Sequence, residues 1–412
     1  MKSAPKGLRL HIGLFGRRNV GKSSLLNAIT RQQVSIVSDQ AGTTTDPVEK
    51  PMELLPLGPV LFIDTAGIDD LGALGELRIK RTRQVFDRTE LGVIISDGGW
   101  GEFEKNLHAE LKSRNVPVVA VFNKIDVAEP ATELVDRLVD QGIQVVKTAA
   151  APGTGVLDFR QALLDAAPDD FIDNPAILAD LLAPGEIAVL VVPIDKEAPK
   201  GRLILPQVQT IRDLLDHRTS CMVVTDAGLP EALGCLKNPP GIVVTDSQAF
   251  EKVAADTPCE IKLTSFSILF ARFKGDLSEQ VRGTLAIEQL KPDDKILIAE
   301  TCSHHPIDED IGRVKIPRWL KKYVGGKLEF THVQGHDFPD DLSPYSLVVH
   351  CAACMFNRRE MLNRILRCRK ADVPITNYGL TIAYSLGIFE RALEPFPAAL
   401  EAYRKAASIP NR

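Results

Sequence analysis

Short apolar runs alternate with longer helix-like segments along the first 167 residues. The runs LHIGLF, PVLFID, LGVIIS and PVVAVF each have the length of a buried strand, and a polar, helix-like segment separates each from the next. This alternation is typical of βαβ units, in which helices connect parallel strands and cover the sheet. The pattern therefore predicts a parallel sheet flanked by helices in the N-terminal part of the chain.

Two further βα patterns follow a stretch rich in Pro, Asp and Ala at residues 166–186, which predicts a domain boundary. The first contains strand candidates IAVLVVP, CMVVTD, GIVVTD and CEIKL, with helix candidates near 207–216, 229–236 and 247–255. The second begins after FSILFARFKGD and contains strand candidates KILIAE, KLEFTHV, YSLVVH and VPITNY. We therefore predict an α/β protein of three domains, each with a mainly parallel sheet flanked by helices: residues 1–170, 180–263 and 264–412.

Bulk composition narrows the class of protein. The chain has 412 residues, of which 44% are hydrophobic and 25% charged, as in soluble globular proteins. The net charge of −5, with both signs interspersed, argues against a broad surface for nucleic acid or anionic membrane. No apolar run could span a bilayer, and MKSAPKGLRL lacks the apolar core of a secretion signal. We expect a cytoplasmic protein with no membrane or nucleic-acid partner.

The stretch GRRNVGKSSLL follows the strand LHIGLF and fits G-x-x-x-x-G-K-[ST] from Gly16 to Ser23. In this motif backbone N–H groups surround the phosphates, and the positive end of the following helix points at them. Lys22 adds a full positive charge, and the Ser23 hydroxyl would bind Mg²⁺. Because a strand precedes the motif and a helix follows it, we predict a phosphate-binding loop rather than a simple glycine turn.

Two later motifs select the nucleotide. DTAG follows the strand PVLFI, so that Asp64 can hold magnesium through water and the Gly67 N–H can contact a γ-phosphate. NKID follows the strand PVVAVF, where the Asp126 carboxylate can accept two hydrogen bonds from the guanine edge and Asn123 can brace the loop. Adenine lacks that pair of donors, so the sequence predicts GTP and GDP as ligands.

The polar stretch AGTTTD contains Thr44, which we expect to bind magnesium only in the triphosphate state. Loops of this kind order on γ-phosphate binding, so residues 36–46 and 65–76 are predicted switch loops. A third base-contacting loop is expected at residues 148–150. The complete set of predicted nucleotide contacts is Gly16, Asn19, Val20, Gly21, Lys22, Ser23, Ser24, Thr44, Asp64, Gly67, Asn123, Lys124, Asp126, Thr148, Ala149 and Ala150.

These motifs resemble the translation-factor-like GTPases, especially the tRNA-modification GTPase and Era group, which share GxxNxGKS, GTTxD and DTAG. The residue after DTAG is Ile68 rather than a water-positioning glutamine. The resemblance implies slow, potassium-stimulated hydrolysis, in which Asn19 helps to hold K⁺ and Glu76 orients water. The equally weighted alternative is that Glu76 is simply a solvated residue of a helix. The catalytic residues implied are Lys22, Thr44, Asp64, Gly67 and Glu76.

Three cysteines follow two predicted strands of the C-terminal part. Cys302 lies in ETCSHHP after KILIAE, and Cys351 and Cys354 lie in HCAAC after YSLVV. The carboxyl ends of parallel strands lie at one sheet edge, so these thiols could meet. Three thiolates suit an iron–sulfur cluster or a Cys₃His zinc site, although a redox pair or inert buried thiols are simpler alternatives. An odd total of seven cysteines without a signal favours thiols or metal ligands over disulfides.

The pattern C-x-H, followed by H-C-x-x-C behind such a GTPase domain, resembles the HydF family of [FeFe]-hydrogenase maturation GTPases along the whole chain. The resemblance implies that Cys302, Cys351 and Cys354 bind a [4Fe-4S] cluster with one iron position open or loosely held. It also implies a scaffold or carrier that receives a di-iron precursor, assembled with radical-SAM maturases, and delivers it to apo-[FeFe]-hydrogenase. His304 and His350 are secondary candidates that bind the fourth iron, donate to a cluster sulfur or shape the loop, and a carboxylate or water could equally fill the position.

The block at residues 187–263 lacks clustered ionisable residues, which favours an interaction role over catalysis. Its strand edges need covering, and pairing with the same edge of a second copy would give a homodimer, as the resemblance also implies. The alternative function is an RNA- or ribosome-directed GTPase with a structural zinc domain. It requires a basic or aromatic face, and the basic run at 358–370 is interpreted first as one face of a solvated helix.

Overall fold

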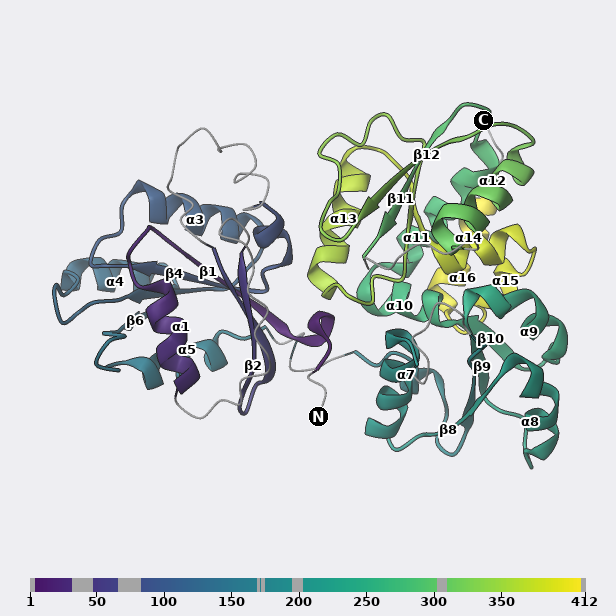
Figure 1. The fold of residues 1–412 in the computed structure, drawn as a ribbon, viewed down its shortest axis with the longest axis horizontal. Coiled ribbons are helices and arrows are strands. Elements are labelled where there is room, and N and C mark those ends of the chain that lie inside the picture. The colour runs from purple at the N-terminus through teal and green to yellow at the C-terminus, as the bar shows by residue number, and fades with distance from the viewer. Residues whose placement is uncertain are drawn as a thin grey trace. The chain divides into compact units, whose positions relative to one another are not determined.

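The computed structural model describes residues 4–31, 47–65, 83–168, 171, 175–194, 203–301 and 310–408. Contacts within the chain divide it into two compact units, residues 1–174 and residues 175–412, which are described separately (Figure 1). Among the described residues, none of the helices combines the length and the apolar composition needed to cross a membrane.

The described part of the first unit contains a six-stranded sheet in the order β2-β3-β1-β4-β5-β6. Its central strands run parallel, and only the edge strand β2 runs antiparallel to its neighbour β3. The bounds are β1 Leu10–Gly16, β2 Val48–Leu54, β3 Gly58–Asp64, β4 Leu91–Ser96, β5 Val118–Phe122 and β6 Gln144–Lys147.

Helices cover both faces of this sheet, which gives the first unit three layers (Figure 1). Apolar residues of α1 and α5 pack on one face, and those of α3 and α4 pack on the other. The bounds are α1 Lys22–Arg31, α3 Glu102–Ser113, α4 Thr132–Asp140 and α5 Val156–Asp165. The predicted strands LHIGLF, PVLFID, LGVIIS and PVVAVF are confirmed as β1, β3, β4 and β5.

The second unit begins with a parallel four-stranded sheet in the order β10-β9-β7-β8. Its strands are β7 Ile187–Val191, β8 Ser220–Val224, β9 Ile242–Thr245 and β10 Lys262–Ser265, and its helices are α7 Leu205–Asp216, α8 Leu229–Cys235 and α9 Phe250–Asp256. The predicted strand CEIKL begins too early. The Ile261 N–H donates to the Pro258 carbonyl, so a turn contains Cys259 and the strand starts at Lys262.

A second parallel sheet follows in the order β12-β11-β13-β14. Its strands are β11 Lys295–Glu300, β12 Glu329–Gln334, β13 Leu347–His350 and β14 Ile375–Asn377. The helices are α10 Phe266–Lys274, α11 Leu277–Thr284, α12 Ile316–Val324, α13 Arg358–Lys370, α14 Tyr378–Ser385, α15 Phe389–Leu393 and α16 Pro397–Ala407, with a π-helical turn at Ile311–Lys315.

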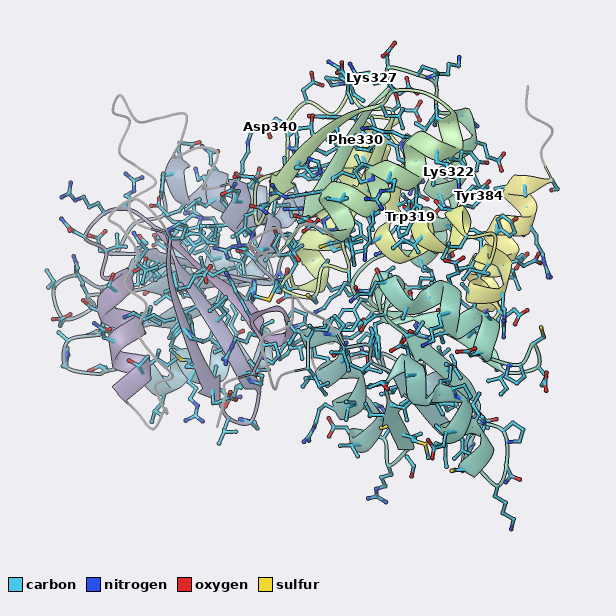
Figure 2. All side chains as sticks on the ribbon, turned by 45° about the vertical axis from the view of Figure 1, so that its right-hand side comes forward. Trp319, Lys322, Lys327, Phe330, Asp340 and Tyr384 are labelled. Carbon is cyan, nitrogen blue, oxygen red and sulfur yellow. The ribbon has the colours of Figure 1, made fainter. Side chains whose placement is uncertain are left out.

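The helices of this second sheet divide between its two faces. α13 packs on one face, whereas α11 and α14 lie against the strands on the other side, and α12 packs on α14 (Figure 1). Figure 2 labels Trp319 on α12 and Tyr384 on α14, the two helices of that pair. The strand ends that precede the predicted phosphate loop and the predicted cysteine site therefore belong to helix-covered sheets.

The two sheets of the second unit are tied together through α15. The Thr264 hydroxyl on β10 donates to the Ala392 carbonyl at 3.1 Å. The Arg391 guanidinium donates to the carbonyls of Ala254, on α9, and of Thr257, which directly follows that helix. The predicted boundary at residue 263 falls inside β10, and the division of this unit into two domains stays a prediction.

Candidate functional site

The predicted phosphate loop connects β1 to α1 and depends on two glycines. Gly16 has a φ of +150°, and a Cβ there would lie 2.3 Å from the Ile95 carbonyl oxygen. Gly21 has a φ of +95°, and a Cβ there would lie 2.2 Å from the Asn123 Nδ2. Between them Asn19 adopts a φ of 63°, a left-handed conformation that asparagine tolerates well. The loop therefore passes too close to neighbouring strands for larger residues at either glycine.

Lys22 and Ser23, at the end of this loop, both form hydrogen bonds in the structure. Lys22 is 7% exposed, and its Nζ donates to the carbonyls of Gly16 at 2.7 Å and Arg17 at 2.8 Å. The Ser23 hydroxyl donates to the Asp64 Oδ2 at 2.7 Å, while the buried Asp64 Oδ1 has no hydrogen-bond partner among the described residues. A hydroxyl beside a carboxylate with one unused oxygen is a donor set that fits Mg²⁺.

Asn123 connects three loops at the carboxyl edge of the sheet. Its Nδ2 donates to the Val20 carbonyl at 2.9 Å, within the phosphate loop. Its Oδ1 accepts from the Thr148 hydroxyl at 3.0 Å and from the Ala150 N–H at 3.1 Å. Because both ends of this buried amide are bonded, the phosphate loop and the predicted base-contacting loop are held at a fixed separation.

The predicted base-contacting residues divide into buried and exposed groups. Thr148 and Ala149 are buried, and the Ala149 N–H donates to the Thr154 carbonyl. The Asp126 carboxylate is exposed at the surface, where it can reach a base. Lys124 has a φ of 61°, and its ammonium lies 3.9 Å from the Asp97 carboxylate. Thr148 and Ala149 therefore shape the loop, while Asp126 offers acceptor oxygens.

Several predicted residues lie outside the described residues. They include the predicted magnesium ligand Thr44, the γ-phosphate contact Gly67 and the water-orienting candidate Glu76. The first switch loop, at 36–46, lies outside them completely, and the second is described only at Thr65. Thr65 anchors the start of that loop, because its hydroxyl donates to the Leu14 carbonyl at 2.6 Å.

The cysteine edge is formed by β11 and β13, which are parallel neighbours with Ala299 opposite His350. The Cys351 N–H donates to the Ala299 carbonyl at 2.9 Å. The Thr301 N–H in turn donates to the Cys351 Sγ at 3.2 Å. Thr301 directly precedes Cys302, which, like His304, lies outside the described residues. The structure therefore brings the Cys351 sulfur to the residue before the third predicted thiol.

The two thiols of HCAAC are free and partly buried. Neither forms a disulfide, and Ala353 between them adopts a φ of 52° in a tight turn. Burial raises the pKa of the Cys351 thiol. Burial, and then the charge of a Cys351 thiolate, raise the pKa of Cys354 to about 12. A metal that binds here must displace protons from both sulfurs.

The described residues alone do not complete a metal site. Within the described ranges, no group of three or more His, Cys, Asp or Glu side chains could hold a metal ion. The segment 302–309, which contains the third predicted thiol, lies outside those ranges. Two thiols at one strand end, with a backbone N–H directed at one sulfur, fit part of an iron–sulfur ligand set.

Both ring nitrogens of His350 form hydrogen bonds. Nδ1 donates to the Cys351 carbonyl at 2.9 Å, and Nε2 accepts from the Arg364 guanidinium at 3.1 Å. Burial, and then the Arg364 charge, lower the pKa of His350 to about 3, so the ring is neutral. The predicted roles of His350 were to bind the fourth iron, to donate to a cluster sulfur or to shape the loop. Because both ring nitrogens are bonded, this arrangement favours the last role. Binding of iron by His350 stays a prediction that requires one of these bonds to break.

Arg364 is a residue of this edge that the sequence interpretation missed. It lies on α13 but is only 3% exposed, so the interpretation of the run 358–370 as a solvated face is wrong for this side chain. Its guanidinium carbon lies 4.8 Å from the ring centroid of Phe338 and 4.5 Å from that of Phe356. The helical spacing of Arg364 with the apolar residues of α13 was the signal that could have shown its burial.

Three family models match the chain. Residues 11–124 match the 50S ribosome-binding GTPase family, which supports a P-loop GTPase domain in the first unit. Residues 177–275 match the hydrogen maturase F dimerization domain, and residues 278–395 match the hydrogen maturase F tetramerization domain. The last two models belong to one family and together cover more than half of the chain.

Curated relatives and solved structures match smaller parts. The tRNA modification GTPase MnmE of Synechococcus sp. (strain JA-3-3Ab) is 38% identical over 171 residues, which cover 40% of this chain and 36% of the relative. GTPase Der of Wolinella succinogenes is 34% identical over 132 residues, 31% of this chain and 27% of the relative. The chain thus spans about a third of the length of these relatives. A crystal structure of Era with MgGDPNP and a 16S ribosomal RNA fragment is 28% identical over 38% of this chain and 56% of that chain, with a TM-score of 0.32.

Proposed function

Because the chain belongs to the hydrogen maturase F family and carries a P-loop GTPase domain, we propose that it is a GTP-hydrolysing scaffold or carrier in [FeFe]-hydrogenase maturation. Cys302, Cys351 and Cys354 bind a [4Fe-4S] cluster in this proposal. The chain assembles the di-iron subcluster precursor with radical-SAM maturases or delivers it to apo-[FeFe]-hydrogenase. It does so in the cytoplasm as an oligomer.

The observation that carries the proposal is the contact between the ends of β11 and β13. The Thr301 N–H donates to the Cys351 Sγ, so the residue that directly precedes Cys302 in the sequence contacts that sulfur. Backbone N–H groups directed at ligand sulfurs are a usual part of iron–sulfur sites. A set of three thiolates leaves one iron position for a bridging ligand of the cargo, whereas four would close the cluster.

The polar groups of the first unit support binding and hydrolysis of GTP. The Lys22 ammonium and the N-terminus of α1 offset phosphate charge, and Ser23 with Asp64 would hold Mg²⁺. When bound, the metal ion would supply positive charge that offsets the charge of the phosphates. The exposed Asp126 carboxylate accepts from the guanine edge, while Asn123 holds the loops around the base.

The remaining catalytic roles belong to the switch loops and to the ion that stimulates turnover. Thr44 binds magnesium in the triphosphate state, the Gly67 N–H contacts the γ-phosphate, and Glu76 orients water. Asn19 contributes to a potassium site at the phosphate loop. Hydrolysis that proceeds equally fast in potassium and in sodium would exclude the role of Asn19.

The nucleotide state controls docking or release of partners in this proposal. The hydrolysis residues and the cluster residues belong to different units, so the GTPase supplies a switch and performs no redox chemistry. Affinity and release rate for the maturases and apo-hydrogenase should therefore differ between GTP, GDP and a non-hydrolysable analogue. Equal values in all three states would exclude this coupling.

The edge strand β8 is the surface proposed for the homodimer. It is an outer strand of its sheet, its burial is incomplete, and the Val223 side chain is 44% exposed. The opposite edge strand, β10, packs against α15. Replacing Val223 by Lys should weaken edge-to-edge pairing, which sedimentation or light scattering would detect as a smaller assembly. An unchanged assembly would place the interface elsewhere.

Anaerobic reconstitution tests the proposed function directly. The full chain, incubated with iron and sulfide and then reduced, should give the paramagnetic signal of a [4Fe-4S] cluster. Cys351→Ser should abolish the signal and leave GTP hydrolysis nearly unchanged, whereas Cys235→Ser, at an exposed cysteine, should preserve both. A zinc content of one per chain, with no cluster, would favour the alternative RNA- or ribosome-directed GTPase with a structural zinc domain.

A further inference from the structure

A buried carboxylate of α3 is bonded to the phosphate loop. Glu104 lies in the first turn of α3 and is only 2% exposed. The Arg17 Nε donates to its Oε1 at 2.8 Å, and the Arg17 Nη2 and the Gly101 N–H donate to its Oε2 at 3.4 Å and 2.8 Å. A buried carboxylate needs such donors, because it has lost its hydration. Glu104 and Arg17 are 87 residues apart in the sequence, so the fold brings the helix to the loop.

The start of α3 also restricts the side chain of Arg17, the second residue of the phosphate-loop motif. The guanidinium carbon lies 5.1 Å from the ring centroid of Phe103, the residue before Glu104. A Cβ on Gly101 would lie 3.6 Å from the Arg17 Nη2 and 3.5 Å from the Glu104 Oε2, so the backbone there lies against both groups. A planar guanidinium that is paired with a carboxylate and placed over a ring has little freedom to rotate.

The main chain of Arg17 in turn holds the lysine of the phosphate loop. The Lys22 Nζ donates to the Gly16 carbonyl at 2.7 Å and to the Arg17 carbonyl at 2.8 Å. Gly16 is the last residue of β1 and pairs with Ile95 of β4, so the sheet fixes the first carbonyl. Arg17 lies beyond the strand, so its carbonyl has no such support. The position of the ammonium therefore depends on how firmly Arg17 is held.

We propose that Glu104 is a positioning residue for nucleotide binding, which acts through Arg17 to hold the Lys22 ammonium in place for the phosphates. This inference rests on the proposed function, because it requires Lys22 to bind the phosphates of GTP or GDP. A charge that is already in place needs no rearrangement when the ligand binds, so the bonds of Glu104 contribute to nucleotide affinity. Glu104 itself contacts no nucleotide in this proposal.

The test measures the affinity of the full chain for GDP with Mg²⁺ by titration calorimetry, after circular dichroism has shown that each variant is folded. Glu104→Gln keeps the shape of the side chain but has one acceptor oxygen, which cannot serve both Arg17 and Gly101, so the Kd should rise roughly tenfold. Arg17→Met removes the same link from the other side and should raise the Kd by a similar factor. The double variant should bind no more weakly than either single variant, because all three lack one link.

Two further variants separate positioning from general support of the loop. Arg17→Lys keeps the charge and can donate to Glu104 from a single ammonium, so it should recover part of the affinity lost in Arg17→Met. In a Lys22→Met background, Glu104→Gln should cause no further loss, because there is no ammonium left to position. An unchanged Kd in both single variants, additive losses in the double variant, no recovery in Arg17→Lys or a further loss in the Lys22→Met background would each overturn the proposal.

Glu102→Gln and Arg114→Met are the matched controls. Glu102 lies in the same turn of α3 but is exposed, and it pairs with Lys105 at 3.0 Å. Arg114 follows α3, pairs with Asp87 and lies 5.6 Å from the ring centroid of Phe86. Both controls should bind GDP like the unchanged protein, because these partners lie outside the phosphate loop. A tenfold loss in either control would contradict the inference, whereas failure of the unchanged chain to bind GDP would refute the proposed function instead.

Discussion

The phosphate loop and the cysteine edge both lie at the carboxyl ends of parallel strands, but they differ in charge. At the phosphate loop, the buried Lys22 ammonium and Asp64 carboxylate already have hydrogen bonds without a ligand. At the cysteine edge, burial raises the pKa of Cys351 and Cys354, so both thiols are neutral. The first region is electrostatically organised without a ligand, whereas in our proposal the second would acquire its charge only when a metal displaced protons.

The two regions can be followed separately. The chain contains two tryptophans, Trp100 in the first unit and Trp319 in the second. Trp100 packs near Phe122, with ring centroids 6.1 Å apart, and Trp319 lies on α12. In Trp319→Phe the remaining fluorescence therefore reports the first unit, and in Trp100→Phe it reports the second. Each variant below can be assigned to the region that it disturbs.

The largest expected effect is a reciprocal loss of function in two variants. Lys22→Met removes the charge that faces the phosphates and should lower GTP hydrolysis by roughly 10³-fold. Iron uptake by the same variant should be normal. Cys354→Ala should abolish the cluster signal and keep hydrolysis within about twofold, since surface or remote changes rarely move a barrier further. Phosphate release and iron analysis measure the two functions on one sample.

A variant that loses both GTP hydrolysis and the cluster signal, while both tryptophan signals stay normal, would contradict the separation of the two regions. It would show that the metal centre and the nucleotide site depend on each other for assembly. Cys259→Ala, at an exposed cysteine, is the control for the loss of a thiol as such. It should leave GTP hydrolysis and the cluster signal intact.

Asp126→Asn should produce the next largest effect. The exposed carboxylate accepts two hydrogen bonds from guanine in our proposal, and an amide cannot accept both. The loss of one charged hydrogen bond costs about 3 kcal/mol, or about 10²-fold in kcat/KM for GTP. Xanthosine triphosphate, which presents an acceptor in place of one donor, should become the better substrate. Equal losses for both nucleotides would exclude a base contact by Asp126.

Gly21→Ala should destabilise the first unit and leave the second unchanged. The new Cβ would lie 2.2 Å from the Asn123 Nδ2 on a backbone with a φ of +95°. Strain and overlap together should cost roughly 2 to 4 kcal/mol of unfolding free energy. Gly142→Ala is the matched control, because Gly142 also has a positive φ but has no atom within 4 Å of a Cβ. It should cost about 1 kcal/mol from strain alone.

The unfolding free energy of both glycine variants is measured with denaturant in a Trp319→Phe background, in which Trp100 reports the first unit. A loss in Gly21→Ala no larger than in Gly142→Ala would show that the phosphate loop can move away from Asn123. The description of this region as fixed before it binds a ligand would then be wrong.

The phosphate loop of the first region could be predicted from the sequence because its motif is contiguous. Glycine, lysine and serine of the phosphate loop are neighbours in the chain, and the strand and helix around them have strong patterns. The antiparallel strand β2 was missed because it includes Lys50 and Pro51 and is buried only in part. Edge strands are held by the register of their neighbour, which a single-sequence pattern does not show.

At the cysteine edge, the sequence predicted the position of Cys351 but not the residues around it. Strand ends placed Cys351 correctly at the sheet edge, since parallel connections fix which ends meet. Arg364 lies on α13, and a charged residue in a helical pattern is normally assigned to solvent. Its helical spacing with apolar residues was a local sign of burial, whereas its contacts with the rings of Phe338 and Phe356 are tertiary and appear only in the structure.

The smallest expected effect is a loss of stability at low pH, which should occur in the first unit and not through the thiols of the cysteine edge. Glu49 on β2 forms ion pairs with Lys6 and with Arg88. Burial alone would raise the pKa of Glu49, but the charges of Arg88 and Lys6 lower it to about 2. Its folded pKa is thus below its unfolded value, so the stability from this carboxylate is present above about pH 4.5 and is lost as the pH falls toward 2.

Glu49→Gln should therefore flatten the acid response of the first unit. The unchanged protein loses on the order of 2 kcal/mol between pH 5 and pH 2 through this group, whereas the variant lacks that contribution at every pH. The thiols of Cys351 and Cys354, whose pKa values are raised, stay protonated in folded and unfolded chains throughout this range and contribute no such slope. Denaturant titrations that follow Trp100 in a Trp319→Phe background measure the effect. An equally steep acid response in Glu49→Gln would assign the slope to another group, such as His11, whose pKa burial lowers to about 3.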